Sequence, residues 1–311
     1  MLNSSNLIDH LQHYIDSHEL NGSKIAIACS AGIDSMVLLK AMLEIYPSDL
    51  IYVLHVDHGW RKDSNEALEF LQSFCETNKV KLLSYQFRYG ELGKKENLAR
   101  KARYEIFKDQ CHKNEIHNIF LAHNLNDHVE TILFRIFRGT NLKGLEGIPR
   151  TRKLDDLTYI HRPLLHSSRL LIEEFAQLNQ IEYIDDSTNQ DLKYSRNRIR
   201  LKIIPEALKI NKNLLNNVEI LSKIVKQERN FIDKAVKQSL TDLGELPWDL
   251  NRFRSLEPII QRRILEKVFT PNIAFVDTFL KCIVLGGFHR INFKKERYFA
   301  IKQKQIWLEL E

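Results

Sequence analysis

The chain has 311 residues, of which 43% are hydrophobic and 28% charged, and its formal net charge is +6. This length allows a large buried core, most naturally as one large domain with a smaller one. Four scattered cysteines with no Cys-x-x-Cys pair argue against a structural zinc site, a disulfide framework or a paired-thiol sulfur carrier, and are typical of reduced cytoplasmic thiols.

The charge is unevenly distributed along the chain. Residues 190–311 hold 24 Lys and Arg against 14 Asp and Glu, whereas residues 1–189 hold 22 against 26. The basic part is a candidate surface for a polyanion, although a solvated helix surface gives the same excess, and charge alone favours that alternative. Residues 1–20 show helical spacing without a continuous apolar stretch, so we expect no signal peptide, no membrane span and a cytoplasmic protein.

Apolar runs alternate with helical segments after a short amphipathic helix at the start of the chain. Their separation of roughly 25 to 35 residues leaves room for one crossover helix each, as in β-α units. We therefore predict an α/β fold with a doubly wound parallel sheet covered by helices on both faces. A fifth strand is expected at residues 157–160 or 181–184, and the pattern does not decide between them. The four runs are residues 25–29, 50–57, 80–88 and 117–123.

The first apolar run ends in the hexapeptide Ser30-Ala31-Gly32-Ile33-Asp34-Ser35, and a helical pattern begins directly after it. Such a strand-to-helix turn presents backbone N–H groups, hydroxyls and a helix N-terminus, which together favour anion binding. The Gly-Lys-Ser/Thr motif that places a lysine on the β- and γ-phosphates is absent, so the turn suits pyrophosphate as a leaving group. A serine-rich helix cap without a ligand is the alternative.

Two further polar clusters follow the second and fourth apolar runs. The carboxyl ends of strands form the ligand site of a doubly wound sheet, so we expect both clusters and the hexapeptide to face one pocket. Their histidines could reach phosphate or ribose, or could be structural, and their spacing excludes a standard zinc site. The clusters are His55-Val56-Asp57-His58-Gly59-Trp60-Arg61 and His123-Asn124-Leu125-Asn126-Asp127-His128-Val129-Glu130.

Three carboxylates in these segments are candidates for catalysis. Asp127 and Glu130 lie three residues apart at the start of a predicted helix, and Asp34 opens another helix, so all can face one side. Carboxylates near a triphosphate need a cation between them, which makes Asp34 and Asp127 candidate ligands of Mg²⁺. Binding of a cationic co-substrate, by Glu130 in particular, is one alternative, and compensation of the helix dipole is another.

The remaining chain is predominantly helical. Arg103 lies on a predicted helix around residues 96–107, where it could point at phosphate or at solvent. We predict a domain of residues 1–210, a helical linker of residues 211–243 and a small α+β domain of residues 244–311. The last of these contains predicted helices at 258–268 and 276–285 and predicted strands at 288–293 and 297–308.

Taken together, these motifs resemble the tRNA(Ile)-lysidine synthetase family of the N-type ATP pyrophosphatases, also called PP-loop enzymes. The resemblance covers residues 24 to about 205, and the C-terminal part is similar to the shorter form of the family with one small domain. Its motifs, in order, are S-A-G-I-D-S, H-V-D-H-G-W-R, N-L-A-R-K-A-R-Y-E-I-F, A-H-N-L-N-D-H-V-E-T, R-P-L-L, and D-S-T-N leading to S-R-N-R-I-R.

Three positions depart from the family pattern. Ala31 replaces a glycine, and because alanine resists positive φ, we expect an ordinary dihedral there. Asn124 replaces a second histidine, so any phosphate contact from it would be neutral. Trp60 replaces a leucine, either as a packing change or to stack on a base.

The resemblance implies an enzyme that uses ATP to adenylate carbon 2 of the wobble cytidine in the CAU anticodon of tRNA(Ile). The amine of L-lysine then displaces AMP and forms lysidine, so that AUA codons are read as isoleucine. ATP would be bound by Ser30, Ala31, Gly32, Ile33, Asp34, Ser35, His55, His58, Arg61, Arg103 and His123. Asp34, Asp127 and Glu130 would bind lysine and catalyse, and Asp34 and Asp127 would also bind Mg²⁺.

The tRNA is expected to contact arginines and a lysine near the pocket rim, because proteins read RNA sequence mainly in single-stranded loops. Alternatively, the last three of these arginines are structural and pair with Asp185 and Asp186. A 2-thiolating tRNA enzyme and a non-catalytic nucleotide- or RNA-binding module are the rival functions, and a homodimer is left open. The candidate tRNA-binding residues are Arg138, Lys143, Arg150, Arg196, Arg198 and Arg200.

Overall fold

The computed structural model describes residues 5–57, 64–86, 96–184, 191–269, 273–285, 289–294, 297–302 and 304–310. The chain divides into two compact units, Met1–Ser222 (unit 1) and Lys223–Glu311 (unit 2). The division falls inside helix α10 (Leu214–Leu243), which lies in the segment predicted as helical, residues 211–243. The domain boundaries expected at residues 210 and 243 stay predictions.

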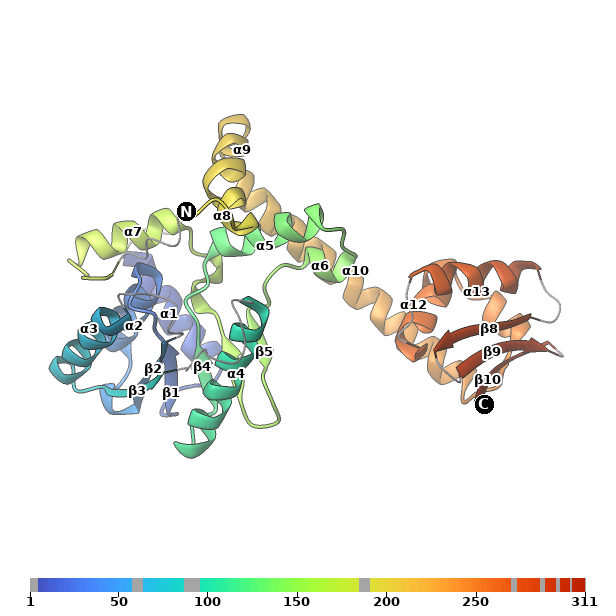
Figure 1. Ribbon diagram of the computed structural model, residues 1–311, viewed down its shortest axis with the longest axis horizontal. Helices are drawn as coiled ribbons and strands as arrows, with labels where there is room; N and C mark the ends of the chain where they lie inside the picture. Colours follow the sequence, from blue (N-terminus) through green and yellow to red (C-terminus); the bar gives the residue numbers. More distant parts are fainter. Residues whose placement is uncertain are drawn as a thin grey trace. The chain divides into compact units, whose positions relative to one another are not determined.

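A six-stranded sheet lies at the centre of unit 1, in the order β3-β2-β1-β4-β6-β5 (Figure 1). All neighbouring strands run parallel except β5, which is antiparallel to β6. The predicted doubly wound parallel sheet is therefore confirmed. The undecided fifth strand lies at residues 159–161, whereas residues 181–184 form no strand. The strands are β1 (Ile25–Ala28), β2 (Ile51–Asp57), β3 (Lys81–Gln86), β4 (Asn118–Phe120), β5 (Thr151–Lys153) and β6 (Tyr159–His161).

The two faces of the sheet are covered by different helices. Alternate residues of a strand face opposite sides, and accordingly Ile25 and Ile27 of β1 join one hydrophobic cluster while Ala26 joins another. The first cluster includes residues of α1 (Ser5–Ser17), α2 (Ile33–Ile45), α3 (Ser64–Thr77) and α7 (Arg169–Leu178), and the second includes residues of α4 (Glu96–Lys113). Burial on both faces explains why these strands read as continuous apolar runs.

Strand order reverses between β1 and β4. The chain proceeds from β1 to β2 and β3 on one side, and β4 then pairs with the other side of β1. The loops after β1 and β4 therefore lie next to each other, at the position where doubly wound sheets bind ligands.

Helix α5 (Leu125–Phe137) follows β4 and packs on the segment that carries the last three candidate tRNA-binding arginines. Leu125 and Val129 of α5 form a cluster with Ile199 and Ile204, and α10 contributes Leu215 and Val218. This packing fixes residues 195–210 beside α5. Short elements complete unit 1: η1 (Ser48–Leu50), α6 (Leu142–Leu145), η3 (Pro163–His166), α8 (Ser195–Arg198), the π-helical turn η5 (Ile199–Ile203) and α9 (Ile204–Ile210).

Unit 2 is a small α+β unit with its own core. Its antiparallel sheet has the order β7-β10-β9-β8, and its buried residues include Trp248, Phe253 and Phe279. The predicted strand at 297–308 is in fact two strands, β9 and β10, which pair antiparallel. The elements are β7 (Trp248–Asp249), α11 (Leu250–Arg254), α12 (Pro258–Phe269), α13 (Ile273–Leu285), β8 (His289–Lys294), β9 (Arg297–Lys302) and β10 (Gln305–Leu310).

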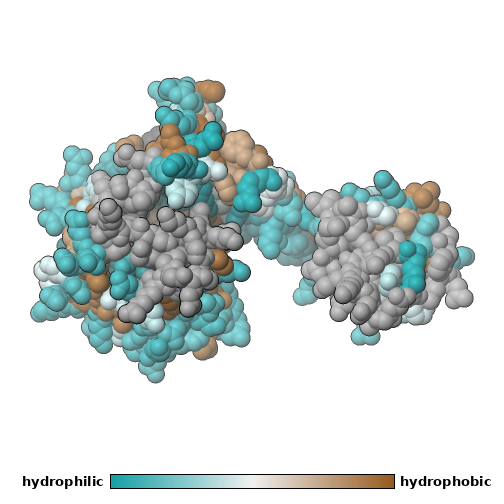
Figure 2. Space-filling view, in the orientation of Figure 1, coloured by the Kyte–Doolittle hydropathy of each residue, from teal (hydrophilic) through white to brown (hydrophobic). Residues whose placement is uncertain are grey.

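Large apolar side chains are exposed on η5 and α9. They include Leu201, Ile203 and Ile210, the last of which is 89% exposed. In Figure 2, which has the orientation of Figure 1, the surface over α9 carries both hydrophobic and hydrophilic residues. Across the described ranges, no helix combines the length and hydrophobicity that crossing a membrane requires.

Candidate active site

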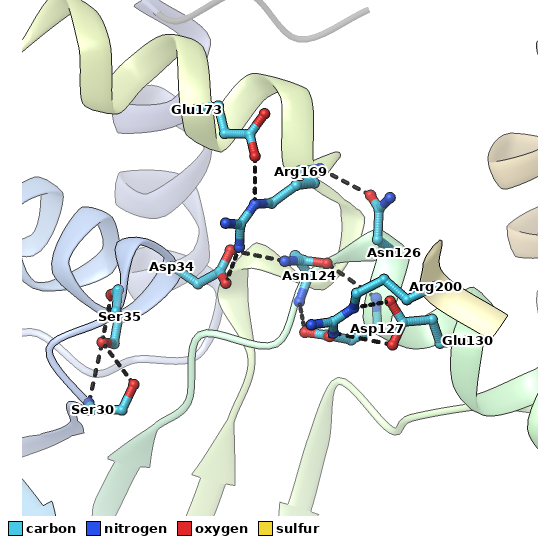
Figure 3. Close-up of polar contacts among 11 residues, drawn as sticks. Ser30, Asp34, Ser35, Asn124, Asn126, Asp127, Glu130, Arg169, Glu173 and Arg200 are labelled. Carbon is cyan, nitrogen blue, oxygen red and sulfur yellow. Dashed lines mark hydrogen bonds and ion pairs between the residues drawn. The ribbon is translucent and has the colours of Figure 1, made fainter. Parts of the chain in front are cut away.

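The loop Ser30–Ser35, called the hexapeptide loop below, connects β1 to α2. The Ser35 hydroxyl donates to the Gly32 carbonyl at 2.8 Å and accepts from the Ser30 N–H at 3.2 Å (Figure 3). Gly32 is the N-cap of α2 and caps it with no side-chain hydrogen bond. The N–H groups of Ser35 and Met36 donate to the Gly32 carbonyl at 3.0 Å, which leaves those of Ile33 and Asp34, at the very start of α2, for an anion.

Ala31 adopts a left-handed backbone conformation with φ +65°, so the expectation of an ordinary dihedral is wrong. Its methyl group is completely buried, and its carbonyl accepts a hydrogen bond from the Ile184 N–H at 2.9 Å. A left-handed dihedral costs a non-glycine residue about 1–2 kcal/mol. The tight turn is therefore kept in this chain despite the strain that the side chain introduces.

Asn124 connects the hexapeptide loop to α5. Its side-chain oxygen accepts from the Asp127 N–H at 3.0 Å, and the Asp127 carboxylate accepts from the Asn124 N–H at 3.1 Å, which is a capping box. The side-chain NH₂ of Asn124 donates to Asp34 Oδ1 at 2.9 Å. One amide side chain thus fixes Asp34 and Asp127 relative to each other.

Asp34, Asp127 and Glu130, called the acid cluster below, lie together at this edge of the sheet (Figure 3). Arg200 donates to Glu130 Oε1 at 2.6 Å and, through Nη2, to Asp127 Oδ1 at 3.0 Å. Arg169 forms an ion pair with Asp34, and its Nε donates to Glu173 at 2.8 Å. Each acid of the cluster therefore has an arginine partner.

Burial changes the protonation equilibria of these acids. It raises the pKa of the Asp34 carboxyl, while the positive charge of Arg169 acts in the opposite direction. Burial also raises the pKa of the Glu130 carboxyl, which is only 4% exposed, and Arg200 opposes that shift. A carboxylate with a raised pKa is a stronger base, which suits a group that accepts a proton.

Comparison with known proteins places this arrangement in a family. Residues 3–207 match the profile of the PP-loop domain. The chain belongs to the PP-loop family. A solved structure, the U34-tRNA thiolase NcsA from Methanococcus maripaludis, superposes with a TM-score of 0.59 over 72% of this chain and 80% of that chain. The two sequences are 14% identical, so this similarity concerns the fold alone.

Several curated relatives are named tRNA(Ile)-lysidine synthase. The one from Pseudothermotoga lettingae is 40% identical over 212 residues, covering 65% of this chain and 46% of the relative. The one from Borrelia garinii is 36% identical over 241 residues, covering 73% and 53%, and the one from Wolbachia is 32% identical over 276 residues, covering 82% and 61%. This chain spans about half the length of the first relatives it matches.

The candidate ATP-binding histidines of this PP-loop protein differ in their surroundings. His55 is buried at the end of β2, and its Nδ1 donates to the Cys29 carbonyl at 2.9 Å, next to the hexapeptide loop. His123 follows β4, and its Nδ1 is buried without a hydrogen-bond partner in the part of the chain that the structure describes. His58 and Arg61, two further candidates, lie outside the described residues.

The predicted tRNA-binding residues separate into two groups. Arg138 and Arg196 lie over the ring of Phe134, at 5.2 Å and 5.8 Å, and Arg198 and Lys143 are exposed. In contrast, Arg200 lies within the acid cluster, and Arg150 is half-buried over the Tyr14 ring at 4.6 Å. Arg150 and Arg200 thus already contact other residues of unit 1, and a role for them in tRNA binding stays a prediction. The alternative partner Asp185 and its neighbour Asp186 lie outside the described residues.

The donor set of Asp34 and Asp127 is compatible with Mg²⁺, which is usually held by one or two carboxylates together with phosphate oxygens. The described residues contain no group of three or more His, Cys, Asp or Glu side chains placed to hold a metal ion. Asp34 Oδ1 is bonded to Asn124, and Oδ2 is paired with Arg169. A cation at Asp34 would therefore replace Arg169 as the partner of Oδ2.

Sequence reasoning did not identify Arg169 or the linking role of Asn124. Arg169 is the first residue of α7, after the N-cap Ser168, and its backbone N–H donates to Asn126 at 2.9 Å. The four-residue spacing between Arg169 and Glu173 is the feature of the sequence that points to an ion-paired arginine here. This spacing is common on helix surfaces, so it does not single out Arg169 as a residue of the site. Asn124 was noted only as a departure from a family pattern, although an asparagine three residues before an aspartate is a recognisable N-cap.

Proposed function

We propose that this protein is an ATP-dependent ligase that forms lysidine on tRNA(Ile). Two similarities support the proposal: membership of the PP-loop family, and curated relatives named tRNA(Ile)-lysidine synthase. The observation that carries it is the convergence of the hexapeptide loop and the acid cluster through Asn124. An anion site and a set of carboxylates within one site suit an enzyme that activates a substrate with ATP and then adds a cationic amine.

In the first step, the wobble cytidine oxygen attacks the α-phosphorus of ATP, and the bond to pyrophosphate breaks. The N–H groups at the start of α2 and the Ser30 hydroxyl hold the leaving pyrophosphate, and the Ser35 hydroxyl joins them by exchanging the Gly32 carbonyl for a phosphate oxygen. Asp34 and Asp127 would hold a Mg²⁺ ion, which would neutralise charge on this leaving group. His55, His123 and Arg103 assist in holding the nucleotide, as do His58 and Arg61.

In the second step, the amine of L-lysine attacks carbon 2 of the cytidine, and AMP leaves. Asp127 and Glu130 bind the ammonium group in exchange for part of their contact with Arg200. The attacking amine must lose a proton, and the raised pKa of Glu130 makes this carboxylate a suitable acceptor. Much of the rate gain comes from positioning ATP, lysine and the tRNA together.

The tRNA anticodon loop approaches from the side of Arg138, Lys143, Arg196 and Arg198. To contact the loop, Arg138 and Arg196 either leave the ring of Phe134 or move together with it. Both movements allow stacking, because arginine guanidinium planes and aromatic rings each stack on unpaired bases. The basic unit 2 provides further contacts to the polyanion. A homodimer stays a prediction.

A 2-thiolation activity is disfavoured by the cysteines. All four are unpaired thiols, and Cys29, Cys75 and Cys111 are buried. Burial raises the pKa of the Cys75 and Cys111 thiols to about 12, so neither forms a thiolate at neutral pH. A sulfur carrier needs an accessible thiolate.

Incubation with tRNA(Ile) bearing a CAU anticodon, [α-³²P]ATP and labelled lysine tests the proposal. We expect lysine label in the tRNA and release of one AMP and one pyrophosphate for each lysine incorporated. Asp34→Asn abolishes both, while Asp49→Asn, at an exposed position in η1, leaves them unchanged. Absence of lysine incorporation by the wild-type protein, with no AMP release, refutes the proposal.

A further inference from the structure

A buried polar contact attaches helix α5, which carries two acids of the acid cluster, to helix α10. His128 lies between Asp127 and Glu130 in the sequence of α5 and is 5% exposed. Its Nε2 is 3.0 Å from the hydroxyl oxygen of Ser222 on α10, and its Nδ1 accepts from the Ile148 N–H at 3.2 Å. Because Nδ1 is an acceptor, the proton of the neutral ring is on Nε2, which donates it to Ser222.

The polar atoms of this contact are all bonded. The Ser222 hydroxyl donates to the Glu219 carbonyl at 2.8 Å, one turn earlier in α10. Gly147 packs against the imidazole, since its φ is +65° and a Cβ there would lie 2.4 Å from Cε1 of His128. A buried polar network with every member bonded holds its groups in one arrangement. The contact therefore fixes how α5 is turned relative to the start of α10.

Ser222 occupies an apolar position of α10. Leu215 and Val218, seven and four residues before it, belong to the hydrophobic cluster formed with Leu125 and Val129 of α5 (Figure 1). Residues at this spacing share one face of a helix. An apolar side chain would fill the position without needing a partner, whereas a bonded polar pair specifies one register between two helices. We therefore assign the serine to alignment rather than to stability.

A second contact links α10 to the acid cluster through the segment before α7. The Nδ1 of His166 lies 2.6 Å from a carboxylate oxygen of Glu219. The carbonyl of the next residue, Ser167, accepts from the N–H of Leu125, the first residue of α5, at 2.9 Å. Arg169, two residues further, forms the ion pair with the acid cluster. One turn of α10 thus contacts both segments that hold the acids.

We propose that Glu219 and Ser222 are positioning residues for the cationic substrate, because they hold α5 so that Asp127 and Glu130 align with its ammonium group. The proposal rests on the proposed function for the identity of that substrate, whereas the attachment itself rests on the contacts above. Both residues lie beyond residues 3–207, the region that matches the PP-loop profile. The hexapeptide loop leads into α2 and not into α5, so the attachment affects lysine more than ATP.

Alanine substitutions on α10 test the proposal against matched controls on α3. Ser222→Ala and Glu219→Ala remove the two contacts, and Ser73→Ala and Glu69→Ala make the same changes at exposed positions. The first assay measures kcat and the KM values of lysine and ATP in lysidine formation. The second follows hydrogen exchange of the backbone amides by mass spectrometry, which requires neither substrate nor turnover.

We expect Ser222→Ala to raise the KM of lysine roughly tenfold, because a displacement of about 1 Å weakens the charged hydrogen bonds to the ammonium group. Glu219→Ala should act in the same direction. The KM of ATP and both control variants should stay close to the wild type. The amides of α5 should exchange faster in the α10 variants, while those of α3 exchange at the wild-type rate.

A lower kcat with an unchanged KM of lysine overturns the proposal, because a loss of folded protein has that effect. Equal increases in the KM values of lysine and ATP overturn it too, as do an unchanged exchange rate of α5 and faster exchange throughout unit 1. If the wild type forms no lysidine but α5 responds selectively to Ser222→Ala, the attachment stands and the proposed function fails.

Discussion

The left-handed conformation of Ala31 makes a quantitative prediction for Ala31→Gly. Glycine removes a strain of roughly 1–2 kcal/mol at this dihedral. It also increases the freedom of the unfolded chain, which costs about 0.4–1 kcal/mol, and it deletes a buried methyl group worth about 0.8 kcal/mol. These contributions nearly cancel, so the free energy of unfolding should stay within about 1 kcal/mol of the wild type.

A matched substitution at an ordinary helical dihedral gives the contrast. Ala41 is equally buried but lies inside α2. Ala41→Gly loses about 1 kcal/mol of helix propensity together with the buried methyl group, for a total of about 2 kcal/mol. Urea denaturation followed by circular dichroism measures both variants. If Ala31→Gly destabilises the protein as much as Ala41→Gly, the strain assigned to the hexapeptide loop is absent.

Three further predictions concern the site. Asn124→Ala removes the α5 cap and should cost about 1 kcal/mol in urea denaturation. It should also raise the KM for ATP, since Asp34 loses a fixed partner, and a change in stability without a change in KM would contradict the positioning role. Asp34→Ala and Asp127→Ala should abolish adenylation in the [α-³²P]ATP assay while RNA binding stays near normal, and full activity of both variants would remove them from the site. Burial lowers the pKa of His128 to about 4, well below its ordinary value of 6.5. The unfolded state therefore binds a proton that the folded state does not, and stability should fall as pH falls below 6.5, by at most about 1.4 kcal/mol per pH unit for this residue. Denaturation at pH 7, 6 and 5 should show a shallower decline for His128→Gln, and identical slopes would contradict the assignment.

The sequence predicted those parts of the fold that depend on hydrophobic runs. β1 and β2 are apolar on both faces, so their burial is visible without coordinates. β5 was missed because its three residues, Thr151–Lys153, have no apolar side chain and pair only at a sheet edge. The choice between residues 157–160 and 181–184 depended on tertiary pairing with β4, which a local pattern does not contain.

The site was predictable to the extent that strand ends converge. The rule for doubly wound sheets brought Asp34 and Asp127 together from separate segments. The pairing of Arg200 with Glu130 was not accessible in the same way, because it depends on the packing of η5 against α5. The dihedral of Ala31 was predicted wrongly, since residue preference was given more weight than the geometry of the turn.

The central claim is that the hexapeptide loop and the acid cluster act on a single triphosphate. A crystal structure with a non-hydrolysable ATP analogue and Mg²⁺ tests it most directly. We expect the β- and γ-phosphates at the first N–H groups of α2, Asp34 separated from Arg169, and the α-phosphorus facing Asp127. A triphosphate bound away from the hexapeptide loop, with the Asp34–Arg169 ion pair intact, would contradict the account.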